Sequence, residues 1–63
     1  MSIKWTCTTE KYGGVDLHYV RDQFEEVACH RFSKLAAVKA ALVEAARRKL
    51  PVIIVEADER GAT

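Results

Sequence analysis

Four segments of the chain have the hydrophobic pattern of β-strands. Residues 3–9 and 15–21 alternate between apolar and polar positions, and residues 25–32 do so more weakly. A period of two is typical of a strand with one buried face. Residues 52–55 are apolar throughout, which is typical of a short strand buried on both faces.

Two short turns are predicted to join the first three strands, and they set the register. The strongest turn signal is Tyr12-Gly13-Gly14. A three-residue loop here pairs Cys7 with Tyr19, which brings the apolar side chains of both strands to one face. A two-residue turn would place polar residues on that face. By the same reasoning, a three-residue loop at 22–24 pairs Tyr19 with Val27.

Residues 34–49 are predicted to form a helix because the segment is rich in alanine and contains no glycine or proline. Ser33 suits the N-cap position, and Pro51 stops the helix. Apolar residues recur at helical spacing and predict the stripe that packs on the sheet. This stripe consists of Leu35, Val38, Leu42, Ala45 and Ala46.

The resulting order, β-β-β-α-β, predicts an α+β fold with a small, three- to four-stranded, mainly antiparallel sheet and one helix on one face. A right-handed crossover places the last strand parallel to the first or to the third strand. We expect it beside the first, which gives the strand order 3-2-1-4, because burial on both faces requires helix cover on one face and contacts on the other. Residues 1–63 form a single domain, and residues 57–63 are expected to be a frayed tail. The expected buried residues are Trp5, Leu17, Tyr19, Val27, Leu35, Val38, Leu42 and Ile53.

Length and charge exclude several classes of protein. A chain of 63 residues builds one small core, which rules out two domains and an enzyme with a deep, enclosed pocket. The net charge of +1 lacks the basic footprint of a dedicated nucleic-acid binder. Two cysteines are too few for a secreted disulfide framework. The chain has no apolar leader and no stretch of about 20 apolar residues. We therefore expect a reduced, cytoplasmic protein with no membrane contact.

No set of residues has the pattern of a catalytic site or a cofactor site, so we expect neither enzymatic activity nor a bound cofactor. Asp16, His18 and His30 share the outer sheet face in the predicted register and are the candidate metal ligands. A solvated polar face is the simpler explanation, because no fourth ligand is evident. Cys7 and Cys29 lie two strands apart, beyond the reach of a disulfide, and are expected to be core thiols.

The predicted helix carries the first candidate binding surface. Ala36, Ala40 and Val43 lie outside the predicted core stripe, and their small side chains permit close approach of another backbone. Arg47 and Arg48 would form a polar rim. We expect this surface to bind a protein partner or a second copy of the chain.

The alternative is nucleic acid, with phosphates bound at the basic end of the helix and bases stacked on the outer sheet face. The residues for this alternative are Arg47, Arg48, Lys49, His18 and Phe32.

The segment HRFSKLAAVKAALVEAARRKLPVIIVEADERG, residues 30–61, is similar to the helix–strand half of a widespread family of small bacterial domains of unknown function. Those domains have a short antiparallel sheet, an alanine-rich helix and a final hydrophobic strand. The resemblance covers the C-terminal half of the chain and implies a fold but no activity. In size and architecture alone, the chain also resembles the phage-encoded anti-CRISPR proteins, which implies an inhibitor.

We therefore expect a small, non-catalytic protein-interaction module. Its specific form would be a phage or mobile-element inhibitor that occludes the surface of a bacterial defence complex. The alternative is a small nucleic-acid-binding protein that uses the open sheet face and the basic helix end.

Overall fold

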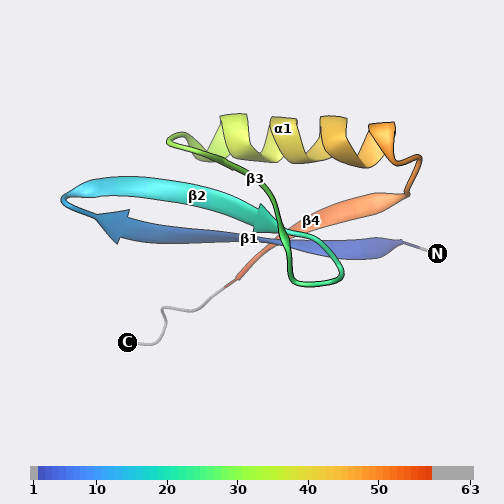
Figure 1. Cartoon of the computed structure of the whole chain (residues 1–63), viewed down its shortest axis with the longest axis horizontal. Coiled ribbons are helices and arrows are strands. Elements are labelled where there is room, and N and C mark those ends of the chain that lie inside the picture. Colours follow the sequence, from blue (N-terminus) through green and yellow to red (C-terminus); the bar gives the residue numbers. More distant parts are fainter. Residues whose placement is uncertain (1, 58–63) are drawn as a thin grey trace.

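Alternating and apolar segments form the four strands of one sheet, and the alanine-rich segment forms the helix. The computed structural model describes residues 2–57 (Figure 1). Its elements are β1 (Ile3–Tyr12), β2 (Val15–Arg21), β3 (Val27–Arg31), α1 (Lys34–Arg47) and β4 (Val52–Glu56). The strand order is β3-β2-β1-β4, with β4 parallel to β1 and the other pairs antiparallel. The predicted α+β fold and strand order are confirmed. Most of the predicted tail, residues 58–63, lies outside the described residues.

One face of the sheet is covered by α1, and the other face has no helix in the described chain (Figure 1). The core lies between the helix and the covered face. Trp5 and Val20 are its largest fully buried side chains. The complete buried cluster is Trp5, Cys7, Val20, Ala37, Ala41 and Ala45.

The predicted core stripe of the helix is right at Ala45, which is buried, and wrong at Leu35, Leu42 and Ala46, which are exposed. Leu35 is 67% exposed and Leu42 is 45% exposed, whereas Ala37, Ala41 and Ala45 face the sheet. The large indole of Trp5 already fills the inner face of the sheet. A row of alanines therefore lets the helix approach closely, whereas leucines on that row would hold it away.

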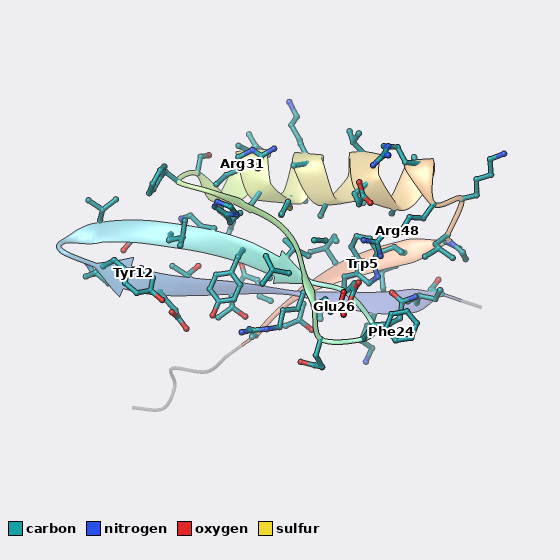
Figure 2. The ribbon with its side chains drawn as sticks, in the orientation of Figure 1. Trp5, Tyr12, Phe24, Glu26, Arg31 and Arg48 are labelled. Carbon is teal, nitrogen blue, oxygen red and sulfur yellow. The ribbon has the colours of Figure 1, made fainter. Side chains whose placement is uncertain are left out.

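Trp5 is fixed from two directions. Its indole Nε1 donates a hydrogen bond to Gln23 Oε1 at 2.8 Å, so the one polar atom of the buried ring is paired. The Arg48 guanidinium lies over the ring, 5.1 Å from its centroid. Figure 2 shows Arg48 reaching from the end of α1 toward Trp5.

The register of the first hairpin also differs from the prediction. Tyr12 pairs with Val15 across a two-residue Gly13-Gly14 turn, and Cys7 pairs with Val20. Both glycines have positive φ angles, 60° and 82°, which favour a turn whose twist matches that of the strands. Val20 therefore faces the helix beside Trp5 and Cys7.

Leu17 and Tyr19 were expected beside Trp5, but the observed register turns them to the uncovered face. Tyr19 is nevertheless buried and Leu17 is half-buried. Their burial was predicted on the wrong face of the sheet. The alternating pattern allowed both registers, because Val20 is an apolar residue on the opposite face of β2 from Leu17 and Tyr19.

The connection between β2 and β3 is longer than the predicted three-residue loop. It spans residues 22–26, and β3 begins at Val27 instead of Glu25. Tyr19 pairs with His30 instead of Val27. The Asp22 carboxylate organises the loop by accepting hydrogen bonds from the backbone N–H groups of Phe24 and Glu26.

The helix begins where the sequence predicts but ends at Arg47, two residues before the predicted end at Lys49, and the burial of β4 also differs from the prediction. The Ser33 side chain accepts a hydrogen bond from the Ala36 N–H, as an N-cap should. In β4, Ile53 is 47% exposed on the uncovered face, so the predicted two-sided burial is wrong. Val27, expected in the core, is also exposed.

Candidate functional site

The uncovered face of the sheet carries a shallow hollow of about 530 Å³. Three strands contribute to it, because the observed register brings alternate residues of β1, β2 and β3 to the same side. Tyr12 lies on the side of the sheet away from α1 (Figure 2). The lining residues are Glu10, Tyr12, Leu17, Tyr19, Arg21, Val27 and His30.

One carboxylate in the lining of the hollow accepts hydrogen bonds from two tyrosines. Tyr19 Oη donates a hydrogen bond to Glu10 Oε2 at 2.6 Å, and Tyr12 Oη donates to Glu10 Oε1. Glu10 and Tyr12 are two residues apart on β1 and therefore share a face. Tyr19 reaches them from β2. The three side chains form one connected polar group among apolar neighbours.

Hydrogen bonding shifts the titration of all three groups. The phenol of Tyr12, followed by that of Tyr19, lowers the pKa of Glu10. The hydrogen bond to Glu10 in turn raises the pKa of Tyr12 and of Tyr19. At neutral pH, Glu10 is therefore a carboxylate and both phenols remain protonated donors. This arrangement orients the tyrosines and does not make either of them a nucleophile.

Arg21 completes the polar part of the hollow. Its guanidinium lies over the Tyr19 ring, 4.7 Å from the centroid, within the range of a cation–π contact. His30 stands opposite Tyr19 on β3. Val27, which also lines the hollow, is an exposed apolar side chain. The hollow thus combines aromatic rings, an arginine and aliphatic side chains.

The candidate metal ligands do not come together. Asp16 and His18 lie on the helix-covered side of the sheet, whereas His30 lies in the hollow on the other side. Asp16 pairs with Lys11, and the His18 ring shares a hydrogen bond with the Thr9 hydroxyl at 2.8 Å. Among residues 2–57, no three potential ligands form a group that could hold a metal ion. The prediction that these residues share a face is wrong, because it depended on the wrong register.

The basic end of the helix is engaged in internal ion pairs. Arg47 pairs with Glu44, and Arg48 pairs with both Glu44 and the buried Asp22. Arg48 therefore connects the helix to the β2–β3 loop. Lys49 is exposed and has a positive φ of 58° at the helix end. Phe32 is 73% exposed just before α1, away from the hollow.

The small-residue surface predicted on the helix is present in part. Val43 is exposed, and Ala36 and Ala40 are half-buried. Arg47 lies beside them on the helix surface, as expected, whereas Arg48 turns toward Trp5. This surface offers one large apolar side chain and no hollow.

The two cysteines are free thiols, Cys7 buried and Cys29 half-buried. Burial is the main cause that raises the pKa of each thiol. Cys29 Sγ donates to the Ala37 carbonyl oxygen at 3.3 Å, so it serves the contact between sheet and helix. Neither thiol is placed as a nucleophile.

Comparison with protein-family models, with curated proteins and with solved structures found no match for this chain. In residues 2–57, no helix has the length and apolar character needed to cross a membrane. The case for function therefore depends on the described surface alone.

Sequence reasoning missed Glu10, Tyr12 and Arg21 as members of a site. The wrong hairpin register separated Glu10 from Tyr19. A usable signal was present, because Glu10 and Tyr12 are spaced by two on one strand and Tyr19 and Arg21 by two on the next. Such pairs meet when a Gly-Gly turn joins the strands directly.

Proposed function

We propose that this chain is a small, non-catalytic protein-interaction module and that the hollow on the uncovered sheet face is its contact surface. The observation that carries the proposal is the cluster of Tyr12, Tyr19, Arg21 and His30 with Val27 around the Glu10 carboxylate. Tyrosine and arginine are enriched at the energetic centres of protein interfaces. The tyrosines are already oriented by Glu10, so less side-chain entropy is lost on binding.

The electrostatics support a protein partner over nucleic acid. Lys11, Lys34, Arg47 and Arg48 each pair with a carboxylate inside the chain. The hollow is lined by one carboxylate, Glu10, and one guanidinium, Arg21, so it lacks the excess of positive charge that binds phosphate. Nucleic acid is the second candidate because Tyr12 and His30 are exposed rings in the hollow on which bases could stack.

The specific form that we propose to test is an inhibitor, encoded by a phage or mobile element, that occludes the surface of a bacterial defence complex. A shallow, rigid sheet face can cover a partner's surface without any chemistry. The size and architecture of the chain support this form.

The test is affinity capture from the source cell with three baits: the wild-type chain, Tyr12→Ala and Val43→Ala. The affinity of each bait for the recovered partner is then measured. Tyr12→Ala removes an exposed ring from the hollow, and Val43→Ala removes a similarly exposed side chain from the helix surface. We expect Tyr12→Ala to weaken binding at least about tenfold and Val43→Ala to have little effect. The opposite pattern would move the contact surface to the helix and contradict the proposal.

A gel-shift experiment with single-stranded oligonucleotides separates the second candidate. A complex that forms at low salt, weakens steeply with added salt and is lost in Tyr12→Ala would favour nucleic acid. No complex at low salt is the result expected for a protein-interaction module.

A further inference from the structure

The outer edge of β4 is an unpaired strand edge. Among residues 2–57, β4 pairs only with β1, so it forms one border of the sheet. The Ile3 N–H donates to the Pro51 carbonyl, and the Ala57 N–H donates to the Cys7 carbonyl. These two bonds show that odd-numbered residues here direct their backbone groups toward β1. Because backbone groups alternate along a strand, those of Val52, Ile54 and Glu56 point out of the sheet edge.

The two borders of the sheet differ in their protection against pairing. β3, at the other border, carries a register shift opposite Val20 and Arg21 and follows a loop containing Glu25 and Glu26. Irregularity and nearby charge are common ways in which an edge strand is kept from pairing. β4 has no register shift, residues Val52 to Val55 are all apolar, and its one charged residue, Glu56, is paired with Lys34. Strand addition is therefore favoured at β4.

An apolar flank of α1 lies on the same side of the molecule as this edge. At 3.6 residues per turn, Leu35, Val38 and Leu42 lie to one side of the sheet-facing alanines, and Glu44 lies to the other. Glu44 holds Arg48, which reaches Asp22 at the β2–β3 loop, so the Glu44 side faces β3. The flank of Leu35, Val38 and Leu42 therefore faces the β4 side.

The helix and β4 are joined on this side by an ion pair. Lys34 Nζ donates to Glu56 Oε2, so the two charges neutralise each other. We call this side of the molecule, formed by the outer edge of β4 and the flank of α1, the wall. Apart from the ion pair, the wall is apolar. Leu35 and Leu42 are exposed on its helix part, and Ile54 and the outward backbone groups of β4 form its strand part. The occupant of such a wall must supply both a strand edge and an apolar helix flank.

We propose that the occupant is a second copy of this chain, joined through antiparallel pairing of the two β4 strands. Ile54 would lie opposite its own copy and Val52 opposite the second copy's Glu56, which matches residues whose backbone groups point outward on both strands. The two-fold axis would place both helices on the same face of a continuous sheet. Their Leu35 and Leu42 side chains would then pack against each other, as a self-complementary interface requires.

The dimensions of the wall set the expected strength of the dimer. One helix and one edge strand give a wall about 20 Å long and about 20 Å high, or about 400 Å² of projected area. This is below the roughly 800 Å² per partner of a standard stable interface. We therefore expect a weak dimer whose population rises with protein concentration. In this dimer both hollows lie on the same side, so the module would present its contact surface twice.

The test is the mass of the chain in solution, measured by sedimentation equilibrium over about a hundredfold range of concentration. The wild-type mass should rise from 7.1 kDa toward twice that value. Leu35→Lys should weaken the dimer at least about tenfold, because it places a charge against an apolar flank. Val43→Lys is the matched control, since Val43 is 62% exposed and Leu35 is 67% exposed. Circular dichroism should show both variants folded.

Hydrogen exchange of the wild-type protein gives a readout that needs no variant. The amides of Val52, Ile54 and Glu56 should exchange more slowly as concentration rises, whereas those of β3 should not change. A monomer at every concentration would overturn the proposal. So would equal weakening by Val43→Lys, or concentration-dependent protection at β3 instead of β4. Absence of the dimer would leave the proposed contact surface in the hollow unaffected, because the two proposals concern different faces of the molecule.

Discussion

Asp22 makes more structural contacts than any other carboxylate in the described chain. Its Oδ1 accepts hydrogen bonds from the Phe24 N–H at 2.8 Å and the Glu26 N–H at 3.0 Å, and its Oδ2 pairs with Arg48 at 3.1 Å. Burial alone would raise its pKa. The hydrogen bonds from Glu26, Arg48 and Phe24 outweigh burial and lower the pKa below its ordinary value of 3.8. The residue therefore joins the β2–β3 loop to the end of the helix.

Replacing Asp22 should destabilise the protein in a pH-dependent way. Asp22→Ala leaves two backbone N–H groups without acceptors, which costs about 1–3 kcal/mol of unfolding free energy at neutral pH. Because the folded pKa lies below the unfolded one, the carboxylate's contribution is full well above pH 3.8. It declines as the pH falls through 3.8 toward the folded pKa. In denaturant titrations of the wild type and Asp22→Ala, the difference in unfolding free energy should therefore narrow as the pH falls below 3.8. A constant difference would show that Asp22 acts only through packing.

The helix of this protein has an alanine face toward the sheet and leucines toward solvent. Ala41 is fully buried, whereas its neighbour Leu42 is 45% exposed. In most amphipathic helices the larger residue faces the core. The inversion arises because Trp5 fills the space between the layers.

Substitutions at the neighbouring residues 41 and 42 should therefore differ in stability in the order opposite to that expected from residue type, with the larger loss at the alanine. Ala41→Leu adds volume at the closest approach of helix and sheet and should cost about 1–3 kcal/mol. Leu42→Ala should cost much less than the roughly 2–5 kcal/mol of a buried leucine. Thermal or urea unfolding of the two variants measures both values. A larger loss of stability in Leu42→Ala than in Ala41→Leu would show that the face with Leu42, and not the alanine face, packs against the sheet.

The molecule as a whole has a small core and a surplus of exposed apolar surface. Trp5 and Val20 are the only large side chains in residues 2–57 that are fully buried. Nine large apolar residues remain exposed, among them Leu35, Val43 and Tyr12. A chain of this size has little core to lose, so burial of these side chains against a partner should add to its stability.

The buried thiol of Cys7 should report on the opening of this small core. Cys7 is 3% exposed, and burial raises its pKa, so the reactive thiolate is scarce and shielded in the folded protein. We expect its reaction with a thiol reagent to be slow in the native state. In Ala41→Leu the logarithm of the reaction rate should rise in proportion to the loss of stability. A Cys29→Ser background isolates the signal. Equal rates in native and denatured protein would mean that Cys7 is accessible without unfolding.

Local signals in the sequence were enough to define most of the elements. Alternation predicted β2 with its observed bounds, and Ser33 and Pro51 marked the limits of the helix segment. The predicted place of β4 beside β1 is correct, although the two-sided burial on which that choice depended is not observed. Connectivity by itself limited the last strand to a position parallel to β1 or to β3. These properties depend on neighbouring residues or on general rules of topology, so one sequence carries them.

Only the tertiary structure decided the register and the orientation of the helix. Both faces of β2 carry apolar residues, Leu17 and Tyr19 on one and Val20 on the other. Alternation alone therefore could not decide which face of β2 packs against the helix. The Gly13-Gly14 turn and the fit of Val20 beside Trp5 made the choice, and the hollow around Glu10 followed from it. The helix likewise had an alanine row and a leucine row at the same spacing. Which row faced the sheet depended on the space left by one indole ring, a volume that no local pattern in the sequence encodes.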